Sequence, residues 1–379
     1  VLAWAAAAGA QQVTESAWRA GADALGRRGG ALRHYAFADD AAVQSNRLGA
    51  AAAMRYRPDG RSTVSAEVGR VAGRRAVVLD GDSFEAPALA LSSNALTVSV
   101  WLRPIAMGRK TGNAGSANGM IVSSGSGYTD GWRLAVYDWG TRQPTFEIGR
   151  EKGAFGLRAN DGLSAGFWTH VAATWDGACV RIYVNGMLSA EKAYEGPAAA
   201  AKSALRLGFS GFGVGSLRMA VDELAVFDVA LAPDEVAALA LVGEPLPGDK
   251  RAAVCRAQEE SAQASPVAGV AYLGLAGDGS LPAAWRAWAK LAAVRLAKEP
   301  NGACAAACAA LFDDPSVPAN LRGQSAEFLV QLCRRGGGEE LPSRVLARLP
   351  ELLELDAEGQ RLFGSALGAS LAREGNIDA

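Results

Sequence analysis

Residues 167–186, FWTHVAATWDGACVRIYVNG, decide the fold class. Two runs with an apolar side chain at every second position flank an Asp176-Gly177 pair, and the second run ends at Asn185-Gly186. Asp-Gly and Asn-Gly pairs beside alternating apolar runs are typical of β-hairpin turns. Because successive side chains on a strand point to opposite sides, this period of two predicts a sheet with one buried face.

The same pattern extends in both directions. Between residues 75 and 230, short runs rich in Val, Ile, Leu, Trp and Phe are separated by Gly, Asn, Asp or Ser. Such spacing predicts an antiparallel sandwich or barrel rather than a parallel α/β sheet. A helix is predicted over residues 232–242, with Pro233 at its start and Asp234 and Glu235 in its first turn.

Six segments resemble, in sequence order, the laminin-G-like, concanavalin A-like jelly rolls common in secreted bacterial proteins. They are VVLDGDSF (77–84), LTVSVWLRP (96–104), GWRLAVY (131–137), residues 167–186, Leu207-Gly208 and VDELAVFDVALAPDEVAAL (221–239). The resemblance covers residues 31–243. It implies a jelly-roll β-sandwich in which residues 34–37, HYAF, form the first strand beside the last one.

Composition excludes two classes of partner. The formal net charge is -1, the pI is near 6.3 and half of the residues are apolar, so the chain has no electrostatic signature of nucleic-acid binding. No apolar run reaches the roughly 20 residues of a membrane-spanning helix. We therefore expect no nucleic-acid partner and no membrane span.

The N-terminal residues predict export. Residues 1–12 resemble the end of a secretory signal peptide, with Ala8-Gly9-Ala10 as the small residues of a cleavage site; an Ala-rich helix is the alternative. Residues 13–30 are expected to form a helix or linker before the sandwich. The predicted location is secreted, periplasmic or at the cell surface. Whether the chain is a fragment of a longer protein is left open by the sequence.

The composition changes after residue 243. Residues 244–250, EPLPGDK, carry two prolines and a glycine and are predicted to be a linker. Over residues 251–379, apolar side chains recur at helical spacing between Gly, Pro and Asn breakers, which predicts five or six helices. An all-α bundle and a short solenoid similar to tetratricopeptide or HEAT repeats are both compatible with this pattern. Trp285 and Trp288 are expected in its core.

The five cysteines predict no metal site. Cys304 and Cys308 lie four residues apart, but the only histidines, His34 and His170, belong to the other domain. If the protein is exported, a disulfide between helices is an option that sequence cannot assign. The cysteines available for it are Cys255, Cys304, Cys308 and Cys333.

The sequence predicts no catalysis. Retaining glycosidases on this scaffold need two carboxylates about 5 Å apart, but the chain has no Glu-x-Asp-x-x-Glu run. Asp222 and Asp228, the nearest pair of equal parity, would lie about 20 Å apart on a strand. No Gly-x-Ser-x-Gly elbow is present, and neither His34 nor His170 shows a base-orienting partner.

The resemblance implies a structural calcium ion. Similar modules often hold one where the early LDGD turn approaches the last strand, which points to Asp80, Asp82 and Asp222. Turns rich in Asp and Gly supply the oxygen ligands that calcium prefers. The alternative makes Asp80-Gly81 an ordinary turn and Asp222 an acceptor of backbone N–H bonds.

Ligand recognition is predicted for the loops, because long loops on a rigid sandwich commonly carry function. The candidate residues lie in the loops 107–119 and 124–131 and at the strand end that follows Trp132. They are Arg109, Asn113, Tyr128, Asp130, Tyr137 and Trp139. In the alternative, Trp139 covers the edge of the core and the 107–119 loop holds no ligand.

The function predicted from these features is an exported, non-catalytic binding or adhesion module. Its partner would be carbohydrate or a cell-surface protein, and the helical domain would mediate assembly. An accessory fragment of a larger glycan-processing enzyme and a purely structural scaffold are the two alternatives, since fold alone does not establish function.

Overall fold

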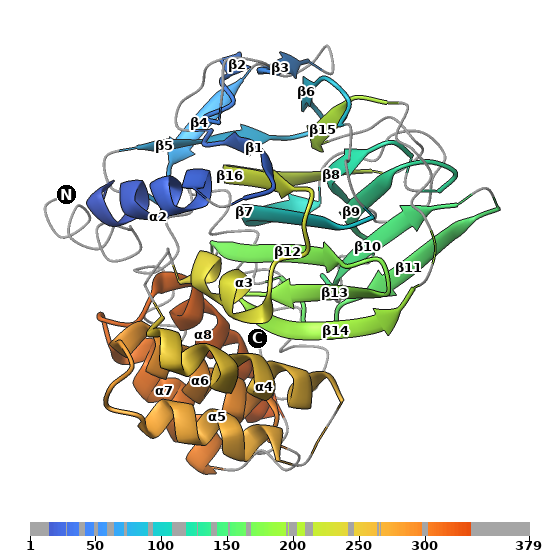
Figure 1. Cartoon of the computed structure of the whole chain (residues 1–379). Coiled ribbons are helices and arrows are strands. Elements are labelled where there is room, and N and C mark those ends of the chain that lie inside the picture. The colour runs from blue at the N-terminus through green and yellow to red at the C-terminus, as the bar shows by residue number, and fades with distance from the viewer. Residues whose placement is uncertain are drawn as a thin grey trace, which may run out of the picture.

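The protein is described by a computed structural model (Figure 1). The structure describes residues 15–27, 29–37, 42–48, 52–58, 64–71, 74–89, 94–107, 119–126, 128–137, 142–150, 152–163, 168–194, 196, 203–208, 215–241, 246–263, 265, 267–297 and 302–334. Residues 1–12, predicted to be a signal remnant, and residues 335–379 of the predicted helical domain lie outside these ranges.

Two antiparallel sheets form the sandwich, as predicted. The first has the order β14-β13-β12-β7-β16, and β16 is flanked on its other side by β1 and by the β5-β4 pair. Its strands are β1 (Ala31–Tyr35), β4 (Ser65–Val68), β5 (Arg75–Leu79), β7 (Leu96–Met107), β12 (Thr169–Trp175), β13 (Cys179–Val184), β14 (Met187–Ala193) and β16 (Gly215–Phe227). The expected pairing of the first strand with the last is confirmed, because His34 lies opposite Ala225.

The second sheet has the order β2-β3-β6-β15-β8-β9-β10-β11. Its strands are β2 (Val43–Gln44), β3 (Met54–Arg57), β6 (Ser83–Ala86), β8 (Gly119–Ser124), β9 (Trp132–Val136), β10 (Pro144–Gly149), β11 (Ala154–Arg158) and β15 (Leu205–Gly208). The start of β16 runs parallel to β8, which joins the two sheets at one corner.

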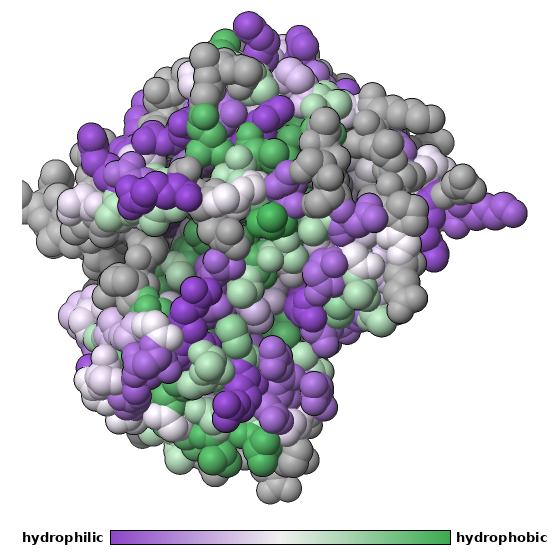
Figure 2. Space-filling model, viewed as in Figure 1, coloured by the Kyte–Doolittle hydropathy of each residue, from purple (hydrophilic) through white to green (hydrophobic). Residues whose placement is uncertain are grey.

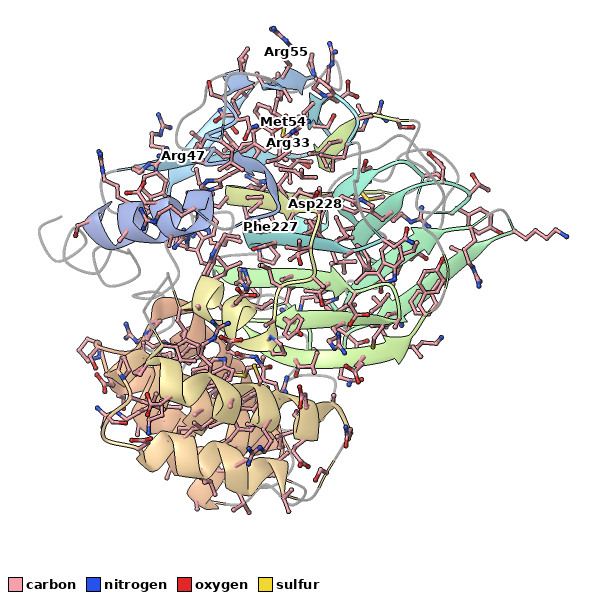
Figure 3. All side chains as sticks on the ribbon, viewed as in Figure 1. Arg33, Arg47, Met54, Arg55, Phe227 and Asp228 are labelled. Carbon is pink, nitrogen blue, oxygen red and sulfur yellow. The ribbon has the colours of Figure 1, made fainter. Side chains whose placement is uncertain are left out.

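Alternating side chains fill the space between the sheets. On β3, Met54 is fully buried in the core, whereas Arg55 is exposed, and Figure 3 shows the two pointing in opposite directions. The same core holds the apolar residues Val171, Ala173 and Trp175 of the hairpin that identified the fold. This arrangement is expected for a β-sandwich, in which every second side chain of each sheet points into the core between the two sheets.

The outer face of the first sheet differs from the prediction of one buried face. All seven residues of β12 are buried. The reason is the helix α3 (Pro233–Ala240), which was predicted from the sequence and packs against this face through Val236. Ala172 and Phe227 belong to the same cluster, so helices replace solvent over this part of the sheet.

Five α-helices follow within the described part of the C-terminal region, where five or six were predicted for the whole of residues 251–379. They are α4 (Arg251–Ala262), α5 (Ala268–Gly277), α6 (Ala283–Arg295), α7 (Gly302–Asp313) and α8 (Ala319–Arg334), preceded by the 3-10 turn η2 (Gly248–Lys250). Trp285 and Trp288 are buried in their core and meet edge to face, with ring centroids 5.6 Å apart. Each helix contacts the next one along the chain.

The helices are joined to the sandwich by buried polar contacts. The side chain of Gln258 on α4 is fully buried; it accepts the N–H of Leu188 at 2.6 Å and donates to the carbonyls of Gly186 and Pro233 at 3.1 and 2.9 Å. Arg295 on α6 forms an ion pair with Asp161 at 2.6 Å. Figure 1 shows the helices beside β12, β13 and β14, below the sandwich.

The thiols that the structure describes give no support to the optional disulfide. Cys255 and Cys308 are free. The Cys255 thiol donates to Asp234 at 3.2 Å, and burial raises its pKa to about 11. Burial raises the pKa of the Cys308 thiol to about 12.

Candidate functional site

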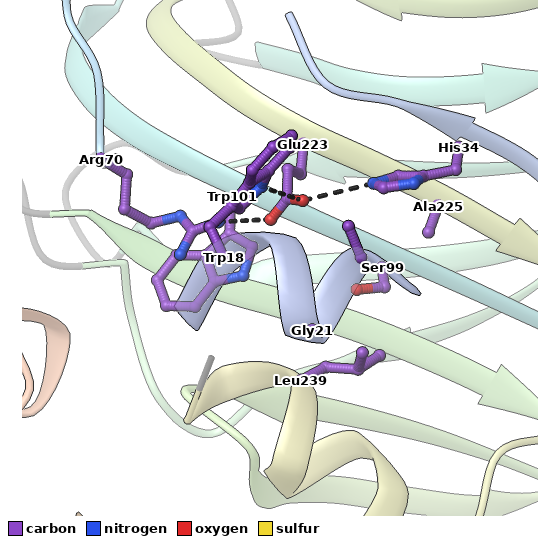
Figure 4. Close-up of a pocket in the computed structure, with 10 residues that line it drawn as sticks. Trp18, Gly21, His34, Arg70, Ser99, Trp101, Glu223, Ala225 and Leu239 are labelled. Carbon is purple, nitrogen blue, oxygen red and sulfur yellow. Dashed lines mark hydrogen bonds and ion pairs between the residues drawn. The ribbon is translucent and has the colours of Figure 1, made fainter. Parts of the chain in front are cut away.

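A cleft lies between the outer face of the first sheet and two helices, α2 (Glu15–Arg27) and α3 (Figure 4). The volume of the cleft is about 450 Å³ when the part that opens to solvent is included. Gly21 of α2 and Leu239 of α3 line its sides, and polar residues line its floor. The remaining lining residues are Trp18, Ala22, His34, Arg70, Ser99, Trp101, Glu223 and Ala225.

Arg70 is bound by two neighbouring carboxylates. Its Nη2 atom donates to Glu223 Oε2, its backbone N–H donates to Asp222 Oδ2 at 3.1 Å, and its Nε lies 3.5 Å from the same oxygen. Adjacent strand residues normally point to opposite faces. Here the pairing of β16 with β7 shifts register between Val221 and Glu223, and this irregularity lets both carboxylates reach one guanidinium.

Glu223 is the centre of the hydrogen-bond network. Its Oε1 atom accepts the Trp18 indole N–H at 2.8 Å and lies 3.2 Å from His34 Nε2. Although burial raises the pKa of Glu223, the Arg70 charge and the contacts with His34 and Trp18 outweigh it and hold the pKa below its usual range. Burial raises the pKa of Asp222 above its usual range. The paired Glu223 is thus the ionised partner of Arg70.

Ser99 and His170 form a second polar pair on the same face. Ser99 Oγ lies 2.9 Å from His170 Nε2, and the His170 ring packs against Trp101 with centroids 5.3 Å apart. Burial, reinforced by the Arg70 charge, lowers the pKa of His170 to about 3, so its ring is neutral near pH 7. His170 Nδ1 has no hydrogen-bond partner, so a triad of nucleophile, base and orienting acid is not assembled here.

Two tryptophans give the cleft its aromatic surface. Arg74 stacks over the ring of Trp18 at 3.7 Å and Arg47 lies over it at 4.8 Å, while Arg70 lies over Trp101 at 4.4 Å. Trp18 and Trp101 are both nearly buried. Cation–π contacts of this kind hold arginines in fixed positions against indole faces.

The proposed calcium ligands are not brought together. Asp82 accepts the Asp80 N–H at 2.7 Å and the Tyr56 hydroxyl at 2.6 Å, while Asp222 is paired with Arg70. Among the described residues, no three His, Cys, Asp or Glu side chains are grouped to hold a metal ion. A guanidinium on Asp222 occupies the place that a cation would take, so these residues do not fit a calcium ion. Calcium binding elsewhere stays a prediction.

The predicted ligand residues do not converge on one place. Tyr128 and Asp130 lie in the turn between β8 and β9, where Asp130 Oδ1 accepts the Ser126 hydroxyl at 2.6 Å and Tyr128 is exposed. Tyr137 follows the opposite end of β9, where Val136 pairs with Gly119. Five strand residues separate these ends by about 17 Å. Arg109, Asn113 and Trp139 lie outside the described residues.

Tyr137 donates to Glu147, which belongs to a polar surface that no sequence pattern indicated. Five residues lie in register across β6, β15, β8, β9 and β10, on the side of the second sheet that faces away from the core. We call them the polar row: Glu85, Arg206, Ser123, Arg133 and Glu147.

Two ion pairs frame the polar row. Arg206 pairs with Glu85 at 2.6 Å, and Arg133 pairs with Glu147, which also accepts the Tyr137 hydroxyl. Ser123 lies between them; it is 1% exposed, and its hydroxyl has no hydrogen-bond partner. Burial, reinforced by Glu147, raises the pKa of the Tyr137 hydroxyl and keeps it protonated.

Sequence reasoning missed most of these residues. Glu223 lies 153 positions from Arg70 and 205 positions from Trp18 in the sequence, and no motif connects the three residues. The polar row gives a weak signal, because each member alternates with a core residue on its own strand. To find that these five residues lie side by side, one must know the order of the strands in the sheet, which only the tertiary structure gives.

Residues 80–237 match the Laminin_G_3 family model, described as the concanavalin A-like lectin/glucanases superfamily. The resemblance inferred from the sequence is confirmed for this segment. The helical C-terminal region is a separate part that no family model names. No curated protein matches the chain significantly.

Several solved structures are similar to part of this chain at low sequence identity. Domain 4 of AbnA, a GH43 extracellular arabinanase from Geobacillus stearothermophilus in complex with arabinotriose, is 21% identical over 55% of this chain and 98% of that one, with a TM-score of 0.44. The binding domain of Paraclostridial Mosquitocidal Protein 1 is 15% identical over 57% and 52% of the two chains, with a TM-score of 0.44. The botulinum neurotoxin serotype G binding domain is 14% identical over 56% and 51%, with a TM-score of 0.42.

This chain therefore spans about half the length of the toxin binding domains that it matches.

The helices in the described ranges include none that is long and apolar enough to cross a membrane.

Proposed function

We propose that this protein is a non-catalytic binding module that recognises carbohydrate through the polar row of the second sheet. The observation that carries the proposal is the Ser123 hydroxyl, which is buried without a partner between two arginine–carboxylate pairs. A buried hydroxyl without a partner costs free energy. A ligand hydroxyl would supply the missing hydrogen bond.

The neighbouring groups suit a sugar. Sugars present several hydroxyls that each donate and accept, and the row offers guanidinium donors and carboxylate acceptors at fixed strand spacing. Tyr137 adds an aromatic ring at one end of the row, against which the C–H face of a sugar can pack. Arg133 and Glu147 hold each other in place, so they lose little side-chain entropy when a ligand binds.

A binding assay against soluble polysaccharides tests the proposal. We expect Ser123→Ala to weaken retardation in affinity electrophoresis by about three- to tenfold, the value of one hydrogen bond, while leaving the melting temperature unchanged or higher. Ser124→Ala is the matched control, because Ser124 is also buried without a partner but belongs to the opposite face of β8. Equal binding by wild type and Ser123→Ala would contradict the proposal, as would absence of binding across the panel.

Absence of catalysis is part of the same proposal. The carboxylates of the first sheet are bound to Arg70, and the Ser99–His170 pair has no orienting acid. Incubation of the protein with the polysaccharides that it binds should release no reducing ends. Export to the periplasm or cell surface also belongs to the proposal, and fractionation of cells that express the full-length protein would test it.

A second proposal concerns the helical region, for which we infer self-association with a second copy of the chain. Val267, Val270 and Leu273 are exposed in and beside α5, a helix with no charged residue, and Figure 2 shows apolar surface at the base of the molecule. A stripe without charge can face its own copy without repulsion. We expect Leu273→Glu to shift the mass measured by light scattering towards the monomer; a wild-type monomer at high concentration would contradict the inference.

A further inference from the structure

We propose that α2 is a reversible strap on the outer face of the first sheet, which leaves the sheet as one unit while the sandwich stays folded. Trp18 anchors the strap, and its departure opens Glu223 and His34 to solvent. The polar row lies on the opposite sheet. The proposal therefore goes beyond the carbohydrate recognition proposed above, and each can fail without the other.

The apolar contact of α2 is small. Of the α2 side chains that the structure describes, Trp18 and Ala22 are buried and the others are exposed, whereas Gly21 is partly exposed. Trp18 and Ala22 pack with Ala36 and Val71 in a cluster that is separate from the core between the sheets. Because no described residue of α2 belongs to that core, the core is complete without α2.

The indole of Trp18 connects α2 to the sheet. Its N–H donates to Glu223 Oε1 at 2.8 Å (Figure 4). The guanidinium groups of Arg47 and Arg74 lie over its ring, at 4.8 and 3.7 Å from the centroid. One side chain thus makes a hydrogen bond to the central strand and most of the apolar contact, so its removal should release the helix.

The surface beneath the strap is polar. Glu223, His34, Arg70 and Ser99 line the floor of the cleft beside α2. Such groups exchange protein hydrogen bonds for water once α2 has left, whereas apolar side chains would be exposed at a cost. Opening this contact is therefore less costly than separating two apolar layers, as in the local unfolding of a low-stability segment.

The helix has little stability of its own. It is 13 residues long, and Gly21 and Gly26 lie within it. Isolated helices shorter than roughly 12–15 residues are marginal in water, and glycine is unfavourable inside a helix. An undocked α2 therefore loses its helical hydrogen bonds. Undocking and unwinding are one event, which amide exchange detects.

The junction between α2 and β1 limits the movement to the helix. The Asp228 N–H donates to the Gly30 carbonyl at 2.8 Å, and a Cβ atom at Gly30 would lie 2.7 Å from Val229 Cγ1. Gly30 is thus fixed against the segment that follows β16. A Cβ atom at Gly29 would meet no atom within 4 Å, so the backbone can turn there without a clash. A turn at Gly29 leaves the pairing of β1 with β16 intact.

Amide hydrogen exchange of the full chain, followed by mass spectrometry, tests the proposal. We expect residues 19–27 of wild type to be at least about 100-fold less protected than residues 169–175 of β12, because local opening costs less than global unfolding. Equal protection of the two segments would show that α2 opens only together with the sandwich, and would overturn the proposal.

Three variants identify the anchor. Trp18→Ala should abolish the protection of residues 19–27, while β12 stays protected. Trp18→Phe keeps a ring but removes the donor to Glu223; it should leave α2 about tenfold less protected than wild type, as expected for a hydrogen bond to a charged acceptor. Asp23→Ala, at an exposed position of the same helix, is the matched control and should exchange as wild type does. Persistent protection of α2 in Trp18→Ala, or loss of protection in β12, would reject the strap.

Discussion

Arg70 and Glu223 stand 153 positions apart in the sequence, and their side chains form an ion pair on the outer face of the first sheet. The pair connects the segment after β4 to the middle of β16, and Glu223 extends it to Trp18 on α2. One carboxylate thus holds the N-terminal helix, a loop and the central strand together. The ion pair also explains why the Arg70 guanidinium is tolerated on a largely buried face of the sheet.

Removing that carboxylate should destabilise the whole domain. We expect Glu223→Gln to lower the free energy of unfolding by about 3 kcal/mol, because buried Arg70 loses the carboxylate that its Nη2 atom donates to and keeps only Asp222, which lies 3.5 Å from its Nε. Urea denaturation followed by tryptophan fluorescence measures it. Glu191→Gln is the control: Glu191 pairs with Arg181 at the surface, where such a pair is worth about 0–1 kcal/mol. Equal effects of the two substitutions would contradict this account.

His170 should make the fold sensitive to acid. Burial lowers its pKa in the folded state to about 3, whereas an unfolded chain takes up the proton near pH 6.5. The unfolded state therefore binds more protons as the pH falls below 6.5, and stability drops by about 1.4 kcal/mol per pH unit.

Comparison of two variants isolates this effect. Between pH 7 and pH 5, wild type and Ser99→Ala, which keeps the histidine, should lose similar amounts of stability. His170→Gln should lose about 2 kcal/mol less over the same interval. Chemical denaturation at each pH gives the values. Parallel pH profiles for wild type and His170→Gln would show that the buried ring does not govern the acid response.

Gly186 should not tolerate a side chain. Its φ is +74°, and a Cβ atom there would lie 2.7 Å from Ala237 Cα on α3. Gly153 has a similar φ of +79° but open space around its Cβ position. We expect Gly153→Ala to cost about 1 kcal/mol from backbone strain alone, and Gly186→Ala to cost clearly more. Thermal melting of both variants checks the difference, and equal losses would refute the close approach of α3.

Gln258 should couple the helices to the sandwich. Gln258→Ala leaves one N–H and two carbonyls at the interface without their partner, at about 1–3 kcal/mol for each buried group. We expect scanning calorimetry to resolve two transitions in this variant, one for the helices and one for the sandwich, in place of a single one. Gln263→Ala, at the exposed end of the same helix, should leave one shared transition.

Calcium should not stabilise the protein through the predicted trio. Asp82 and Asp222 already accept hydrogen bonds from Tyr56, Asp80 and Arg70. We expect Asp82→Asn to leave any change in melting temperature on adding millimolar calcium as it is in wild type. A calcium-dependent increase that Asp82→Asn removes would restore the ion site implied by the family resemblance.

Local sequence was sufficient for the sandwich because its signals are short in range. Turn pairs such as Asp176-Gly177 and Asn185-Gly186 set the hairpins, and alternate apolar residues chose the inner face. The same holds for α3, which starts at Pro233, and for the helices between the glycine and proline breakers. These features depend on φ preferences and on neighbours within a few residues.

The contacts that build the candidate sites could not be predicted from local sequence patterns, because they join residues that are far apart in the chain. Sequence parity separates Asp222 from Glu223, and only a register shift in β16 brings both to Arg70. Strand β9 likewise separates Tyr128 from Tyr137, two of the candidate ligand residues, because they lie beyond its opposite ends. The sequence by itself determined which side chains face inward, since burial follows local periodicity. Which polar groups meet on the outer faces was decided only by sheet order, bulges and helix docking, because those contacts join segments with no local relation.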